Sequence, residues 1–123
     1  MKLQQQNNDH LNTVTAYGDG YVSINGIRHT GNLAILPDQL HPDWTTACFE
    51  TLTIEDFDWL ATLDAEIILL GTGKTLRFPR HELLQPLVRA QKGLEVMDLP
   101  AACRTYNVLM SEGRKVAAGL LLI

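Results

Sequence analysis

Hydrophobic and polar positions alternate in the first part of the chain and predict antiparallel β structure. Residues 13–17 and 21–25 show strand-like alternation, and Gly18-Asp-Gly20 between them is typical of a turn. A third short strand is expected over residues 33–36, where Pro37 stops it. Residues 41–52 show neither strand-like alternation nor helical spacing of apolar residues. They are expected to form an irregular connection that has room for one short strand.

Helical spacing replaces this alternation after residue 53. Helices are predicted over residues 54–61, 80–91 and 100–110, and buried strands over residues 65–71, 94–97 and 114–123. Asp98 or Leu99 is expected to cap the last helix, and Gly93 is expected to end the one before it. Pro86 within that middle helix predicts either a kink or a later start.

The order of these elements predicts one α/β domain. Strands that alternate with helices imply parallel crossovers, and the opening hairpin adds antiparallel strands. We therefore expect a single domain over residues 13–123, with a mixed β-sheet, an N-terminal antiparallel hairpin and helices packed on the sheet. Residues 1–12 are polar and rich in Gln and Asn, which predicts a flexible N-terminal tail.

Composition narrows the class of protein. The chain has 123 residues, of which 46% are hydrophobic and 20% charged, and its formal net charge is −4. These values are typical of a globular domain, and the negative balance argues against a nucleic-acid partner. No apolar run is long enough to span a bilayer, and no leader segment is expected.

Cysteine and histidine positions give no metal or redox pattern. Cys48 and Cys103 lack a CxxC spacing and are expected to be reduced core residues of a cytoplasmic protein. The four histidines form no ligand set, so neither a metal nor a cofactor is expected. No nucleophile elbow or catalytic triad order is present, and an enzymatic activity is not predicted.

The segment Gly71-Thr-Gly-Lys-Thr75 resembles the end of a phosphate-binding loop but lacks its beginning. The full motif requires a glycine where this chain has Ile68, and a helix starting at Lys74, whereas residues 76–79 have an extended pattern. Two interpretations remain. The glycines let backbone amides approach a ligand at a strand end, or they form a plain tight turn.

The last helix carries polar residues besides its expected core face of Leu99, Cys103, Tyr106 and Met110. Arg104 and Asn107 share another stripe and could bind a carboxylate or a phosphate. Alternatively, they contact a neighbouring loop or solvent.

Asp98 allows a similar pair of interpretations. It caps the last helix, or it provides a carboxylate close to Lys74 and Arg114 in a crevice beside the glycine loop.

Three blocks of sequence carry a resemblance to a known family. They are Tyr17–Gly26, Ile67–Gly73, and Val96–Asp98 followed by Ala101–Asn107 and Glu112–Ala118. In these blocks the chain resembles the MTH-type domain of unknown function, and its overall character is similar to that of proteobacterial members. The family includes the adipogenesis-associated domain protein and a mitochondrial factor that assists assembly of respiratory complex I.

The resemblance implies a mixed sheet flanked by helices, with a crevice near the glycine loop. Carried over to this sequence, the residues implied for that crevice are Gly71, Thr72, Gly73, Met97, Asp98, Arg104, Thr105, Asn107 and Arg114. One departure is Leu99, because similar members usually have threonine after the aspartate.

The family has no established reaction, and its mitochondrial members act through protein contacts. The resemblance therefore implies a non-catalytic interaction or assembly protein with a protein partner. The alternative is a small-molecule binding protein or an unassigned enzyme that takes a small anionic ligand in the crevice at Gly71–Gly73.

Overall fold

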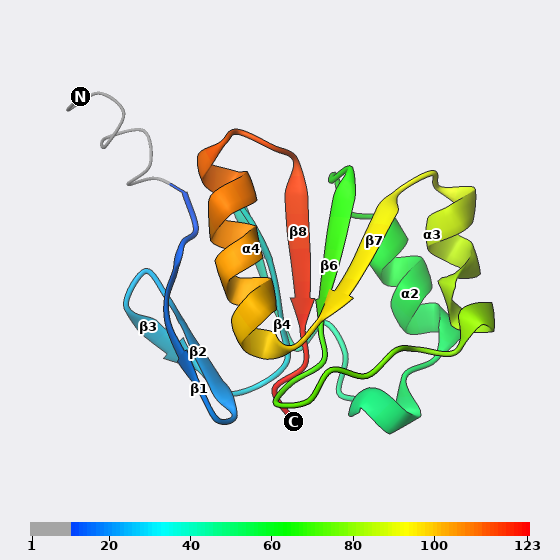
Figure 1. Cartoon of the computed structure of the whole chain (residues 1–123), viewed down its shortest axis with the longest axis horizontal. Coiled ribbons are helices and arrows are strands. Elements are labelled where there is room, and N and C mark those ends of the chain that lie inside the picture. The colour runs from blue at the N-terminus through cyan, green and yellow to red at the C-terminus, as the bar shows by residue number, and fades with distance from the viewer. Residues whose placement is uncertain (1–10) are drawn as a thin grey trace.

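The computed structural model describes residues 11–123 and shows an α/β fold with two sheets (Figure 1). The predicted fold class is confirmed: a small antiparallel sheet precedes a larger mixed sheet that carries helices on both faces. Of the expected tail over residues 1–12, only Leu11 and Asn12 lie within the described residues. The Asn12 side chain donates hydrogen bonds to Leu36 O and Gln39 O, each at 2.9 Å.

The small sheet consists of β1 (Val14–Gly18), β2 (Tyr21–Ile24) and β3 (Ile27–His29), paired antiparallel in that order. The first two strands form the predicted hairpin. The third was not predicted, because its three residues are mostly exposed and show no alternation of buried and exposed positions.

The larger sheet has the strand order β5-β4-β8-β6-β7. Its strands are β4 (Leu33–Leu36), β5 (Gln39–Pro42), β6 (Ile67–Gly71), β7 (Gly93–Met97) and β8 (Val116–Leu120). Strand β6 pairs in parallel with β7 and β8, whereas β4 pairs antiparallel with β5 and β8. Strand β5 begins before residues 41–52, the segment in which the sequence left room for one strand, and shares only His41 and Pro42 with it. Pro42 is tolerated because β5 lies at an edge of the sheet.

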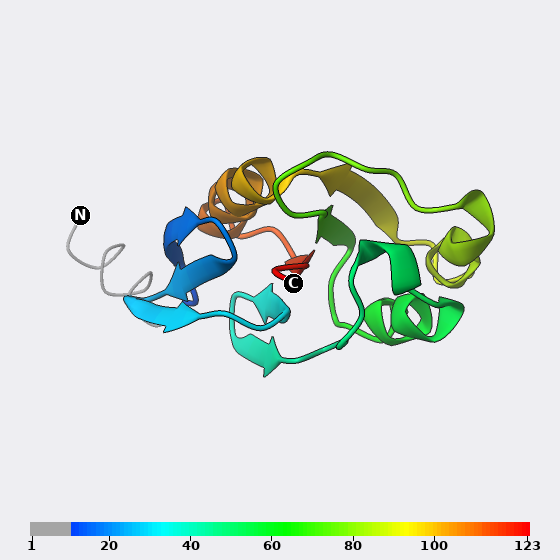
Figure 2. The ribbon, with the colours of Figure 1, turned by 90° about the horizontal axis from the view of Figure 1, so that it is seen from below.

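Helices cover the two faces of this sheet (Figure 2). Helix α4 (Leu99–Ser111) packs on one face, and helices α2 (Ile54–Ala61) and α3 (Gln85–Arg89) pack on the other. Two short 3-10 helices, η1 (Phe49–Thr51) and η2 (His81–Leu84), lie on the same side as α2 and α3. Successive residues of β6 point to opposite faces, so Leu69 joins the α4 core while Ile68 and Leu70 join the α2 core. This double burial explains the unbroken apolar run of β6.

The middle predicted helix required two corrections. It begins as η2 and becomes α-helical at Gln85, so Pro86 lies in the first helical turn and marks a later start rather than a kink. Gly93 does not end it. Gln91 takes the left-handed backbone conformation after α3, with φ of 59°, while Gly93 is already the first residue of β7 and donates its N–H to Glu66 O.

The core face predicted for the last helix is confirmed. Leu99, Cys103, Tyr106 and Met110 are all buried against the sheet. Cys48, expected in the core, is instead half-buried at the start of η1, where its Sγ lies 3.5 Å from Thr51 Oγ1.

Candidate functional site

The carboxyl ends of β6, β7 and β8 meet at one edge of the larger sheet, and the loop after β6 is fixed there by backbone hydrogen bonds. Thr72 N–H donates to Met97 O at 2.9 Å, and Leu121 N–H donates to Gly71 O at 3.0 Å. Leu99 N–H donates to Gly73 O at 2.7 Å. These bonds place the glycine loop beside the start of α4, as ligand sites of α/β sheets commonly are.

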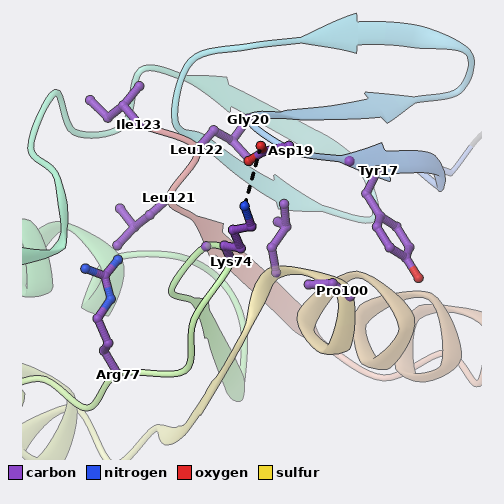
Figure 3. A pocket seen from close by; sticks show the side chains of 12 residues that line it. Tyr17, Asp19, Gly20, Lys74, Arg77, Pro100, Leu121, Leu122 and Ile123 are labelled. Atoms are coloured by element: carbon purple, nitrogen blue, oxygen red, sulfur yellow. Dashed lines mark ion pairs between the residues drawn. The ribbon is translucent and has the colours of Figure 1, made fainter.

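A cleft of about 480 Å³ opens between this edge and the β1–β2 turn (Figure 3). Its lining comes from that turn, the loop after β6, the first turn of α4 and the segment after β8. The lining residues are Tyr17, Gly18, Asp19, Gly20, Gly73, Lys74, Arg77, Leu99, Pro100, Leu121, Leu122 and Ile123. Of the nine residues expected to form the crevice, Gly73 is the one that lines this cleft.

Gly71 serves helix packing. A methyl group at this position would lie 3.0 Å from Leu120 Cδ2 and 3.1 Å from Ala102 Cβ, which is closer than carbon atoms normally approach. Gly71 therefore lets α4 lie close to β6. Gly73 is different, because its φ of 88° belongs to the left-handed region that glycine adopts readily.

Thr72 is buried and organises the loop from within. Its Oγ1 donates to Thr75 O at 2.7 Å and accepts from Arg77 N–H at 3.2 Å. No helix begins at Lys74, so the segment is a turn and not a phosphate-binding loop of the nucleotide-hydrolysing type.

Asp98 caps α4. Its Oδ1 accepts a hydrogen bond from Ala101 N–H at 2.9 Å, which confirms the capping interpretation. Met97, the residue before it, is half-buried and packs against the core beneath α4.

The polar stripe of α4 faces the small sheet. Asn107 forms two hydrogen bonds with the backbone of Val14, and Arg104 Nη1 donates to Tyr17 Oη at 3.1 Å. The alternative in which these residues contact a neighbouring segment is therefore the one found. Thr105 is half-buried on the same helix.

Arg114 lies at the opposite end of the larger sheet. It directly precedes the amino end of β8, where Val116 pairs with Ile67, whereas Asp98 follows the carboxyl end of β7. The expectation that Arg114 lies beside Asp98 and Lys74 is wrong, because β8 runs parallel to β6 and carries its first residues away from the glycine loop.

Arg77 is a charged cleft residue that the sequence did not indicate. Its Nη1 forms an ion pair with Glu50 Oε2 at 2.6 Å, and its Nη2 donates to Thr72 O at 2.9 Å. The guanidinium also stacks over the Phe49 ring at 4.6 Å. Arg77 stands alone between Leu76 and Phe78, so only these tertiary contacts identify it.

Lys74 forms the second cationic position of the cleft. Its Nζ lies 3.8 Å from Asp19 Oδ2, and both side chains are 82% exposed (Figure 3). The pair joins the loop after β6 to the β1–β2 turn across the mouth of the cleft. Exposed pairs of this kind contribute little to stability, so Lys74 can exchange partners.

Residues 11–123 contain neither a metal-binding cluster nor a membrane-spanning helix. No group of three or more His, Cys, Asp or Glu side chains in that part of the chain could hold a metal ion. Within the same residues, no helix combines the length and the apolar character needed to cross a membrane.

Comparison with known proteins confirms the resemblance. A family described as "Protein of unknown function (DUF498/DUF598)" matches residues 14–121. The chain is 38% identical over 116 residues to a bovine (Bos taurus) protein named NADH dehydrogenase [ubiquinone] 1 alpha subcomplex assembly factor 3. That match covers 85% of this chain and 60% of the bovine protein, so the chain spans less than two thirds of the length of this relative.

Two solved structures share the fold. A crystal structure of a Bordetella parapertussis protein superimposes with a TM-score of 0.83 at 39% identity, covering 90% of this chain and 95% of that one. A solution structure of a Bordetella pertussis protein described as a Mth938-like domain gives a TM-score of 0.77 at 34% identity, with coverages of 91% and 86%.

Proposed function

The chain belongs to the family of unknown function DUF498/DUF598, and on that premise we propose that it is a non-catalytic assembly-type protein that acts through contacts with other proteins. The observation that carries the proposal is its 38% identity to a protein named as an assembly factor of NADH dehydrogenase. The proposed process is assembly of respiratory complex I.

The chemistry of the site supports a non-catalytic role. Thr72, Asp98 and Asn107 use their polar atoms in hydrogen bonds with their own chain. A catalytic group needs a free polar atom within reach of a substrate. These three side chains hold the loop, the helix and the small sheet in place instead.

Residues 76–78, which lie beside the cleft, supply a surface suited to protein contact. Phe78 is 71% exposed and Leu76 is 47% exposed, while Arg77 between them is tied inward to Thr72 and Glu50. Apolar side chains that are exposed next to one another mark surfaces suited to protein contact. We propose that Leu76 and Phe78 contact the assembly partner.

The proposed compartment is the cytoplasm. Cys48 and Cys103 are both free thiols, which supports a reducing environment.

The function can be tested by removing the chain from its host. Assembled NADH dehydrogenase complex, measured on native gels, is expected to fall, and the wild-type chain is expected to restore it. Phe78→Ala is expected to restore it poorly, whereas Val108→Ala, which truncates another exposed apolar residue, 54% exposed and on α4, restores it fully. An unchanged amount of complex in the deletion strain would refute the proposal.

A second candidate function is binding of a small anionic ligand. It is favoured by the cleft of about 480 Å³, which is lined by two cationic groups, Lys74 and Arg77. Asp19 pairs with Lys74, and Glu50 pairs with Arg77. Pockets of this size commonly hold small molecules.

A further inference from the structure

The cleft has a fixed cation, a mobile cation and an apolar wall, and together these define a class of ligand. The inference rests on the second candidate function and specifies what the cleft would bind.

The fixed cation is Arg77. A guanidinium has five N–H groups, and the described contacts use one on Nη1, with Glu50, and one on Nη2, with Thr72 O. Nε is buried and has no acceptor within residues 11–123. One N–H on each Nη therefore remains for an acceptor in the cleft. Because Phe49 and Thr72 already hold the group, a ligand would not have to order it.

The mobile cation is Lys74. Its described ion pair with Asp19 is long, at 3.8 Å between Nζ and Oδ2, and both side chains are exposed. A carboxylate entering the cleft would compete with Asp19 for Lys74 Nζ. Asp19 is thus expected to oppose anion binding, while Lys74 and Arg77 favour it.

Part of the cleft wall is apolar. Pro100 in the first turn of α4 and Leu122 and Ile123 after β8 keep exposed apolar surface in the cleft (Figure 3). Leu99 and Leu121 lie behind this surface and are only 4% and 1% exposed. Gly73 lies close to both the segment after β8 and the Arg77 guanidinium, since a methyl group at Gly73 would be 3.6 Å from Leu121 O and 4.0 Å from Arg77 Nη2. A fully charged ligand such as phosphate would leave this wall unused, whereas a hydrocarbon chain would cover it.

We propose that the cleft binds a small amphipathic carboxylate, with its carboxylate at Arg77 and Lys74 and its hydrocarbon part along Pro100, Leu122 and Ile123. The ligand carboxylate accepts hydrogen bonds from the free Nη N–H groups of Arg77 and displaces the Asp19 carboxylate from Lys74. The apolar part of the ligand excludes water from the wall, which strengthens the ionic contact.

The test uses octanoate as the probe, followed by amide NMR shifts of the full chain. Octanoate is expected to move the amides of Gly18, Gly73, Lys74 and Leu122, with a dissociation constant of about 1 mM or lower. Acetate has the charge without the chain, and 1-octanol has the chain without the charge, so both are expected to bind at least about tenfold more weakly. Equal shifts with acetate would remove the apolar part of the proposal, and equal shifts with 1-octanol would remove the ionic part.

Two variants change the ionic contact in opposite directions. Lys74→Gln is expected to weaken octanoate binding about three- to tenfold, and Asp19→Asn is expected to strengthen it about two- to fivefold. The matched controls are Lys115→Gln and Asp64→Asn, because Lys115 and Asp64 form a similar exposed pair, 3.4 Å apart, away from the cleft. A role in folding alone would not give opposite signs in the two cleft variants.

The outcomes separate this inference from the functions on which it stands. If inorganic phosphate moves the cleft amides and octanoate does not, the cleft binds anions but the amphipathic ligand is wrong. If no probe moves them at concentrations up to about 10 mM, both the ligand class and the second candidate function are overturned. Neither result affects the assembly proposal, which is measured by the amount of NADH dehydrogenase complex.

Discussion

The side chain of Asn107 pairs with both backbone polar groups of Val14. Its Oδ1 accepts from Val14 N–H at 3.0 Å and its Nδ2 donates to Val14 O at 2.8 Å, so one amide side chain on α4 acts as a strand partner for β1. Residues 93 positions apart are joined in this way. The bond pair fixes the small sheet, and with it one wall of the cleft, against the helix.

Asn107→Ala is expected to destabilise the protein by about 1–3 kcal/mol, because it leaves two partly buried backbone groups of Val14 without a partner. Urea unfolding would measure the change. Ser111→Ala is the control, since the Ser111 hydroxyl bonds only to Val108 O within the same helix and is exposed. A loss below about 0.5 kcal/mol for Asn107→Ala would show that water replaces the amide without cost.

Gly71→Ala is expected to cost about 1–3 kcal/mol, because the added methyl group would press on Leu120 and Ala102 and push α4 from the sheet. Gly93→Ala serves as the comparison, since the nearest atom to its added methyl group is Glu66 O at 3.9 Å. Thermal unfolding of the two variants should separate them clearly. Equal stabilities would mean that α4 shifts freely and that Gly71 is not needed for packing.

Thr72→Val keeps the shape of the side chain but removes the hydroxyl that joins Thr75 O to Arg77 N–H. Hydrogen exchange at the Arg77 amide is expected to speed up about tenfold, which corresponds to about 1.4 kcal/mol. Thr75→Val retains both hydrogen bonds, because Thr75 contributes only its backbone carbonyl to them. If the two variants exchange at the same rate, the Thr72 hydroxyl does not order the loop.

Alkaline pH is expected to destabilise the fold through two buried groups. Burial raises the pKa of the Cys103 thiol from 9.0 to about 12, and burial also raises the pKa of the Tyr106 phenol above its usual value. Above pH 9 the unfolded chain therefore binds fewer protons than the folded one. Stability is complete below that pH and is lost as the pH rises toward 12, by about 1.4 kcal/mol per pH unit for each ionising group.

The measurement is urea unfolding at a series of pH values from about 8 to 11, where the ordinary thiol and phenol ionise. Cys103→Ala is expected to remove the loss between pH 9 and 10, because Tyr106 begins to contribute only near pH 10. An unchanged slope in this variant over that interval would contradict the assignment to Cys103.

Several elements could be predicted from the sequence because their signals are local. The strand Leu33–Leu36 and the helix Ile54–Ala61 have the predicted bounds, and Asp98 caps α4 as its position before Pro100 indicates. Strand β3 gave no such signal, since its exposed residues form an edge whose pairing depends on β2 alone. The left-handed conformation of Gln91 was also missed, because a nearby glycine is the more usual left-handed residue.

The sequence by itself determined the periodicity of the elements and the core face of α4, because each depends on residue spacing within one segment. The order of the elements indicated the α/β domain, and the resemblance of three blocks indicated the family. The tertiary structure alone decided the roles that depend on partners distant in the chain. Gly71 lies under Ala102, Asn107 meets Val14, and Arg114 faces the far end of the sheet. Arg77 is held at the cleft by its bonds to Thr72 O and Glu50. These relationships join residues distant in the chain, and spacing carries no information about which distant segments the packing brings together.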